Sequence, residues 1–165
     1  MKQVNNIPRA NVTIYTDGAC LKNPGPGGYG AVLVHGDRVK EISKGFPDTT
    51  NNRMELSGVI SALEALKYPC KVQIFTDSQY IARAINHGWL DKWQKNGWKT
   101  SNRNEVKNRD LWQKMINLLN RHQVEFKWIK GHSGDIYNER CDVLAKDAAR
   151  KVDAAQAKKL NMKGT

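Results

Sequence analysis

The order in which strand-like and helix-like segments follow one another constrains the fold of this chain more than any other feature of its sequence. Near the N-terminus, three segments rich in β-branched and aromatic residues are separated by a glycine-rich turn and then by a two-residue hairpin turn. These segments are Val12–Thr16, Tyr29–His35 and Arg38–Phe46, with Gly36–Asp37 as the hairpin turn. Consecutive strands joined by tight turns pair antiparallel. The chain is therefore predicted to begin with a three-stranded antiparallel sheet.

After residue 46 the spacing of apolar residues changes from the strand period of two to the helix period of 3.6. The elements expected next are a helix capped by residues 49–52, a strand over Val72–Thr76, a helix from Ser78 to about His87, a helix over Asn108–Arg121, a strand over Val124–Ile129 and a last helix from about Asn138. Strands that follow helices in this way run parallel to the first strand through right-handed crossovers. The sequence thus predicts an α/β fold with a five-stranded mixed sheet, three antiparallel strands and then two parallel ones, and helices on both faces.

The length of 165 residues is typical of one domain, and we expect residues 1–165 to form a single one. Residues 11–150 are expected to form its core, and residues 89–107 an insertion that interrupts the regular alternation of strands and helices. The alanine- and lysine-rich segment 151–165 is expected to be a fraying helix end.

Cysteine spacing and hydropathy indicate where the protein acts. Cys20, Cys70 and Cys141 are far apart and form no Cys-x-x-Cys pair, which argues against a zinc site or a disulfide framework and favours a reducing cytoplasm. No apolar run approaches the ~20 residues of a membrane span, and the N-terminus lacks the apolar centre of a signal peptide. Because no unpaired apolar stripe remains, we expect a monomer that does not bind membranes.

The chain is strongly basic, with 27 Lys and Arg residues against 16 Asp and Glu residues and a formal net charge of +11. Such an excess attracts polyanions, although a basic cytosolic protein without a nucleic-acid partner also has it. The excess is concentrated in the insertion, where Glu105 is the only acid between Lys92 and Arg109. The basic residues of this stretch are Lys92, Lys95, Lys99, Arg103, Lys107 and Arg109.

The insertion and the helix after it are also rich in tryptophan: Trp89, Trp93, Trp98 and Trp112. We predict that at least two of these side chains form a small local core, since Trp89 and Trp93 have the i, i+4 spacing of neighbours on a helix. Aromatic faces beside cationic side chains also suit sugar stacking and phosphate contact.

Four acidic residues lie where the predicted pattern changes from one element to the next. Asp17 and Asp77 each follow a strand, and the carboxyl ends of adjacent parallel strands meet at one sheet edge. Glu55 lies on the helix face that packs against the sheet. Asp142 lies about one turn into the last helix, whose dipole favours negative charge there.

Each acid taken alone is more simply explained by local structure. Asp17–Gly18 is a common turn dipeptide, Asp77 precedes a helix cap, Glu55 could be an exposed helix residue and Asp142 a dipole-satisfying acid. Together, converging carboxylates in a basic protein favour a bound divalent metal, since hard cations such as Mg²⁺ prefer oxygen ligands. Metal held next to a basic surface is the chemistry of phosphodiester cleavage.

Seven segments of the chain resemble bacterial type 1 ribonuclease H in sequence and in order. They are Tyr15–Cys20, Asn23–Gly30, Thr50–Leu56, Thr76–Tyr80, Gly97–Thr100, Lys130–Gly134 and Asn138–Asp142. The resemblance covers about residues 11 to 150 and implies the ribonuclease H-like fold. It also implies an endoribonuclease that hydrolyses the RNA strand of RNA/DNA hybrids, giving 5′-phosphate and 3′-hydroxyl ends.

The resemblance assigns roles to the acids and to one histidine. Asp17, Glu55, Asp77 and Asp142 would hold two Mg²⁺ ions, for which Mn²⁺ would substitute, with Asp17 bridging both. His132, between glycines in the loop Lys130–Gly134, would assist proton transfer or product departure. Its ordinary pKa near 6.5 suits proton transfer at neutral pH, although a loop histidine without a role is as common.

The resemblance also implies how a hybrid would be bound. Cys20, Asn23, Asn51 and Gln79 would face the RNA strand, whose 2′-hydroxyls distinguish it from DNA. Thr50, Ser78 and Asn108 would hold a phosphate of the DNA strand. Trp89, Trp93, Lys95 and Lys99 belong to the insertion, which is similar to the basic protrusion that grips the DNA strand in this family.

Other functions remain open at this stage. A DNA-processing nuclease of the same fold, such as a transposase, integrase or junction resolvase, would share the acidic site. A non-catalytic hybrid-binding module would need an incomplete acidic set, and the set is complete here. A nuclease domain excised from a polymerase polyprotein is a further alternative.

Overall fold

The computed structural model describes residues 9–131 and 134–163. Its elements are β1 (Asn11–Cys20), β2 (Gly25–His35), β3 (Arg38–Thr49), α1 (Asn51–Glu64), β4 (Lys71–Thr76), α2 (Gln79–Asn86), α3 (Trp89–Lys95), α4 (Arg109–Arg121), β5 (Gln123–Trp128) and α5 (Ile136–Lys163). The strands form one sheet in the order β3-β2-β1-β4-β5. β1, β2 and β3 pair antiparallel, whereas β4 is parallel to both β1 and β5. The predicted five-stranded mixed sheet is therefore confirmed.

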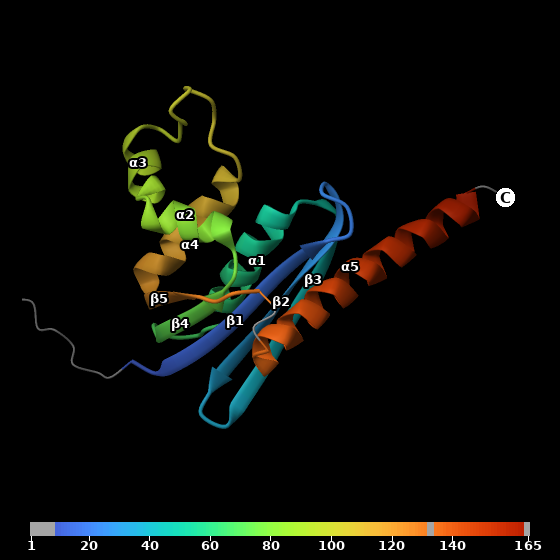
Figure 1. Cartoon of the computed structure of the whole chain (residues 1–165), viewed down its shortest axis with the longest axis horizontal. Coiled ribbons are helices and arrows are strands. Elements are labelled where there is room, and N and C mark those ends of the chain that lie inside the picture. The colour runs from blue at the N-terminus through green and yellow to red at the C-terminus, as the bar shows by residue number, and fades with distance from the viewer. Residues whose placement is uncertain (1–8, 132–133, 164–165) are drawn as a thin grey trace, which may run out of the picture.

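Helices cover both faces of the sheet, as predicted (Figure 1). α5 packs along β1, β2 and β3 on one face, and α1 packs on β1 and β2 on the other, where α4 lies against α1. Small residues allow the close approach of α5, because a Cβ at Gly30 would lie 2.5 Å from the carbonyl oxygen of Cys141. A glycine-to-alanine change there would force strand and helix apart.

The main core lies between the sheet and α1, α2 and α4. Its strand side chains include Ile14 and Ile74, and its helix side chains include Leu56, Leu63 and Trp112, all with no exposed surface. Full burial of each aliphatic side chain of this kind stabilises the fold by about 1.5–3 kcal/mol. This packing fixes the strands and helices whose ends carry the acidic residues.

Two details differ from the prediction. The insertion contains a short helix, α3, which the predicted order of elements lacks. This helix follows Gly88, which caps it in a left-handed conformation without a side-chain hydrogen bond, and it has no buried residue. It therefore lacks a side-chain cap and a fully buried apolar stripe, so the helical spacing of Trp89 and Trp93 is its one signal in the sequence.

α5 is longer than expected and continues to Lys163. Figure 1 shows it extending well past the end of the sheet. Residues 151–163 are mostly exposed, so fraying of this end in solution stays a prediction. Among the residues that the structure describes, no helix combines the length and apolar character needed to cross a membrane.

Candidate active site

The register of two parallel strands places Asp17 beside Asp77. β1 and β4 pair from Asn11 with Lys71 to Tyr15 with Phe75, and each aspartate lies two residues beyond that last pair. β4 ends before Asp77, as predicted. β1, however, continues with β2 as far as Cys20, so Asp17 lies inside a strand and not after its end.

The prediction that Asp17–Gly18 could be a turn dipeptide is wrong, because both residues pair with β2 in the ladder. The glycine is required by close packing. A Cβ at Gly18 would lie 2.7 Å from the backbone nitrogen of Glu55, in the second turn of α1. This contact between β1 and α1 brings the Glu55 carboxylate next to that of Asp17.

Carboxylate oxygens of Asp17, Glu55 and Asp77 all lie within 4.8 Å of one another. They line a cavity of about 530 Å³ together with residues from β1, α1, α2 and α5. The Asp17 Oδ1 atom accepts a hydrogen bond from its neighbour's N–H at 2.9 Å. The Glu55 Oε2 atom is buried and has no hydrogen-bond partner in the described part of the chain.

Crowding changes the acidity of two of these groups. Burial raises the pKa of Asp17 to about 7, and the nearby charges of Asp77 and Asp142 add to the effect. Burial, followed by the charges of Asp17 and Asp77, also raises the pKa of Glu55 well above its ordinary value. Without a cation, keeping these carboxylates ionised therefore lowers the free energy of unfolding.

Asp142 joins the same cavity from the far side of the sheet, on α5. It lies nearly two turns into that helix, which begins at Ile136, two residues before the predicted start near Asn138. It is not among the three carboxylates whose oxygens lie within 4.8 Å. Instead, its Oδ2 atom accepts a hydrogen bond from Lys146 Nζ at 2.9 Å, one turn further along the helix.

The acidic cluster fits a divalent cation. An unpartnered, buried carboxylate oxygen is unfavourable unless a donor or a cation satisfies it, and Glu55 supplies such an oxygen. Close oxygen atoms from several carboxylates are the ligand set that Mg²⁺ takes in proteins. Asp17, Glu55 and Asp77 therefore form the centre of a candidate cation site, and Asp142 lines the same cavity.

His132 lies outside the described residues, so the structure does not place its side chain. The adjacent Gly131 does approach the site, because a Cβ at that position would lie 2.8 Å from Asp77 Oδ2. The proposed role of His132 stays a prediction.

Several residues expected to contact the RNA strand surround the same cavity. Cys20, Asn51 and Gln79 line it, as does Ser78. Asn23 lies beside them, since its Oδ1 atom accepts a hydrogen bond from the backbone N–H of Asn51 at 3.1 Å. The structure thus brings these predicted residues together around the carboxylates, and their contact with a substrate stays a prediction.

The residues expected to hold a DNA phosphate lie at helix N-termini. Thr50 caps α1, and its Oγ1 atom accepts a hydrogen bond from the Arg53 backbone N–H at 3.2 Å. Ser78 caps α2 in the same way, as the sequence predicts. Asn108 precedes α4 with a left-handed backbone (φ 61°) and no capping bond of its own.

A second cavity, of about 560 Å³, lies in the insertion. Its lining includes Trp89, Trp93, Lys95 and Lys99, all four predicted to bind substrate. The six basic residues predicted to form a cationic face in and beside the insertion are all exposed. This cavity therefore combines apolar ring faces with positive charge.

The predicted small local tryptophan core is wrong, because the buried tryptophans belong to the main core of the protein. Trp98 and Trp112 are the buried members, with 7% and no exposure, whereas Trp89 and Trp93 are half-buried. The Trp93 ring centroid lies 5.8 Å from that of Trp112 and 6.1 Å from that of Trp98. Helical spacing identified neighbours correctly but not which neighbours face inward.

Sequence reasoning missed two residues of the site. Lys146 lines the main cavity and pairs with Asp142. Its spacing of four residues from an acid on the same helix was the available signal. Tyr80 also lines this cavity and accepts hydrogen bonds from Asn108 and Trp112, which no local pattern indicates.

The sequence profile of the RNase H family matches residues 9–150 of the chain. The protein named Ribonuclease H from Chlorobium phaeovibrioides is 59% identical over 140 residues, which cover 85% of this chain and 96% of that one. Its counterpart of the same name from Syntrophus aciditrophicus is 53% identical over 146 residues, covering 88% and 84%.

Solved structures agree with the sequence comparison. LC9-RNase H1, described as a type 1 RNase H with the type 2 active-site motif, has a TM-score of 0.79 and 33% identity, over 88% of this chain and 75% of that one. LC11-RNase H1, solved in complex with an RNA/DNA hybrid, has a TM-score of 0.66 and 26% identity, over 85% and 97%.

Proposed function

The chain belongs to the RNase H family, and from that premise we propose that it is an endoribonuclease that hydrolyses the RNA strand of RNA/DNA hybrids. The observation that carries the proposal is the cluster of Asp17, Glu55 and Asp77 oxygens within 4.8 Å, with one Glu55 oxygen unpartnered. A carboxylate cluster of this kind attracts divalent cations, and the cations in turn attract a phosphodiester. The hybrid as substrate is supported by the likeness to an RNase H1 solved with one.

We propose that Asp17, Glu55, Asp77 and Asp142 hold two Mg²⁺ ions, with Mn²⁺ as a substitute. Bound ions would supply a lowered pKa for the attacking water and charge neutralisation at the leaving oxygen. Burial raises the pKa of Asp17 to about 7, so a nearby positive charge favours its ionised form. Lys146, which is part-exposed and pairs with Asp142 at 2.9 Å, would compete with a cation for that carboxylate.

In the proposed reaction, water forms a bond to phosphorus and the bond from phosphorus to the ribose 3′-oxygen breaks. The products are a 5′-phosphate on one fragment and a 3′-hydroxyl on the other. His132 is proposed to carry the proton that must move when the leaving oxygen departs. Its imidazole is suited to this exchange near neutral pH.

Recognition of the hybrid is proposed to involve both cavities. Cys20, Asn23, Asn51 and Gln79 cluster around the carboxylates, where short polar groups can contact the 2′-hydroxyls of RNA. Thr50, Ser78 and Asn108 are proposed to hold a phosphate of the DNA strand. Trp89, Trp93, Lys95 and Lys99, around the second cavity, are proposed to contact that strand further along.

The leading alternative is a DNA-processing nuclease of the same fold, which would use the same carboxylates on a different polymer. The exposed basic residues beside the half-buried tryptophans favour a duplex-gripping surface in either case. A non-catalytic hybrid-binding module is disfavoured, because the three central carboxylates are present and converge. We also propose that the protein acts as a monomer in the cytoplasm, and its free, widely spaced cysteines support the reducing compartment.

The test is cleavage of four end-labelled substrates: an RNA/DNA hybrid, double-stranded RNA, single-stranded RNA and double-stranded DNA. Each is incubated with Mg²⁺, with EDTA, and with the Asp17→Asn protein in Mg²⁺. Cleavage confined to the RNA strand of the hybrid, and lost in both controls, supports the proposal. Cleavage of DNA would favour the transposase or resolvase alternative, and tight hybrid binding without cleavage would favour the binding module.

A further inference from the structure

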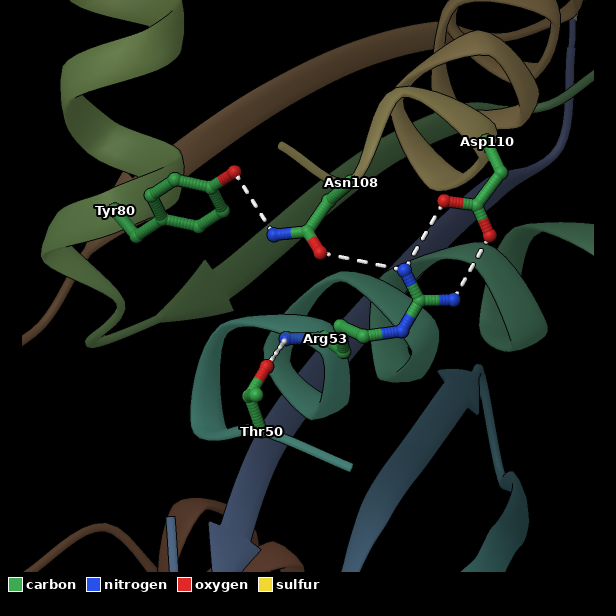
Figure 2. A network of polar contacts seen from close by, with 5 residues as sticks. All are labelled: Thr50, Arg53, Tyr80, Asn108 and Asp110. Atoms are coloured by element: carbon green, nitrogen blue, oxygen red, sulfur yellow. Dashed lines mark hydrogen bonds and ion pairs between the residues drawn. The ribbon is translucent and has the colours of Figure 1, made fainter. Parts of the chain in front are cut away.

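Arg53 on α1 forms hydrogen bonds with residues at the N-terminus of α4 and so links the N-termini of the two helices (Figure 2). The guanidinium of Arg53 donates two hydrogen bonds to Asp110, at 3.0 and 2.8 Å, and a third to Asn108 Oδ1, at 3.2 Å. The backbone N–H of Arg53 donates to Thr50 Oγ1. One residue thus contacts both Thr50 and Asn108, which are 58 positions apart in the sequence.

The contact with Arg53 determines which way round the Asn108 amide lies. A guanidinium has donors and no acceptor, so only the carbonyl oxygen of the amide can face it favourably. The Asn108 Nδ2 atom then points to Tyr80 Oη, at 3.2 Å (Figure 2). In the reversed orientation, amide hydrogens would face guanidinium hydrogens.

Tyr80 reinforces this orientation. Its Oη atom also accepts a hydrogen bond from Trp112 Nε1 at 2.9 Å, so both lone pairs of the hydroxyl are used. The side chain of Trp112 is fully buried, so its N–H holds the Tyr80 hydroxyl in a fixed position. The side-chain amide of Asn108 has two N–H groups, and one of them donates a hydrogen bond to Tyr80 Oη.

The result is a small set of hydrogen-bond donors beside two helix N-termini. Asn108 keeps one N–H group for a further partner, and the hydroxyl of Thr50 keeps its hydrogen because its oxygen is the acceptor of the Arg53 N–H. Donors without competing acceptors suit an anionic oxygen, and helix N-termini favour negative charge.

We infer that the guanidinium of Arg53 is a positioning group that orients Asn108, so that Asn108 and Thr50 together hold a phosphate of the DNA strand. The inference rests on the proposed function, in which these two residues bind that phosphate. Arg53 itself is not proposed to touch the substrate, since Asp110 engages its guanidinium in a bidentate pair. Its effect is on binding, because the acidic cluster lies on other residues.

The test is the steady-state kinetics of hybrid cleavage by Arg53→Met. We expect KM to rise about tenfold, the size of one lost hydrogen bond to a charged oxygen, with kcat unchanged. Arg53→Lys should not restore KM, because a point charge cannot pair with Asp110 and orient the amide at once. An unchanged kcat also reports that the variant has folded.

Arg140→Met provides a matched control. Arg140 also forms a bidentate ion pair, with Glu41, and it is similarly exposed, with 46% of its side chain accessible against 35% for Arg53. Both changes remove one positive charge and one ion pair. Arg140→Met should leave KM within about twofold of the wild-type value, and an equal rise in both variants would overturn the inference.

A double-mutant cycle separates the inference from the function on which it rests. Asn108→Ala should raise KM, and adding Arg53→Met should then have no further effect. If the two changes multiply, Arg53 acts independently of Asn108 and the inference fails. If Asn108→Ala leaves KM unchanged, the phosphate contact fails with it, although cleavage of the hybrid would still support the proposed activity.

Discussion

Replacing Asp17 by asparagine removes one charge from three carboxylates whose oxygens lie within 4.8 Å of one another. In the folded protein the pKa of Asp17 is raised from 3.8 to about 7, mainly by burial. Above both values, keeping the group ionised in the folded state costs about 4 kcal/mol at most, since each pKa unit corresponds to about 1.4 kcal/mol. The cavity is open to solvent and the two neighbouring acids share the effect, so we expect about half of this cost.

The sign of the pH dependence follows from proton binding. Between pH 3.8 and about 7 the folded protein binds a proton at Asp17 more readily than the unfolded chain does, so stability falls as the pH rises through this range. Without metal, Asp17→Asn should therefore be more stable than wild type by about 2 kcal/mol at pH 8. For a chain of this length, that difference raises Tm by roughly 4–8 °C. At pH 5 the difference should shrink, because the wild-type carboxyl is then largely protonated.

The assay is thermal unfolding in EDTA at pH 8 and at pH 5, followed by circular dichroism. Asp37→Asn is the control, since Asp37 lies exposed at the tip of the β2–β3 hairpin and its replacement makes the same change in net charge. That variant should not gain stability. An Asp17→Asn protein that melts at or below the wild-type temperature at pH 8 would refute the reasoning, as would a gain that is equally large at pH 5.

Three further changes test other parts of the structure. Gly18→Ala should lower stability by about 1–3 kcal/mol and should also lower activity, because the new Cβ would lie 2.7 Å from the Glu55 backbone nitrogen. Denaturant titration and a cleavage assay measure the two effects, and unchanged values would contradict the close packing. His122 is 3% exposed and burial lowers its pKa, so this group should cost stability as the pH drops below about 6.5. Urea titrations at pH 7 and 5 compare wild type with His122→Gln, and an equal change of midpoint in both proteins would contradict this contribution. His132→Ala should slow turnover while leaving measurable cleavage in single-turnover assays, and complete loss would contradict an auxiliary role.

The sequence predicts the sheet and the position of two aspartates well, for a physical reason. Strand alternation and tight turns determine which strands pair, and parallel strands place their carboxyl ends together. The expectation that Asp17 and Asp77 are neighbours follows from this rule and is confirmed by the β1–β4 register. The extent of β1 does not follow from it, because the additional pairs depend on glycines of β2 that carry no strand signal.

Other features depend on contacts between residues distant in sequence. The bond between Arg53 and Asn108 joins two helix ends whose approach depends on how α1 and α4 pack. No local spacing encodes that approach. Similarly, the burial of Trp98 and not of Trp89 depends on the course of the loop after α3, where Trp98 has a left-handed backbone (φ 64°).

The claim on which the proposed reaction depends is that the acidic cluster binds a divalent cation. Calorimetric titration of Mg²⁺ into the protein at pH 7, in two buffers of different ionisation enthalpy, measures the protons released on binding. With the pKa of Asp17 at about 7, we expect release of about half a proton or more per molecule, and less for Asp17→Asn, which retains only the raised pKa of Glu55. Binding without proton release, or equal release by both proteins, would contradict a cation site centred on this carboxylate.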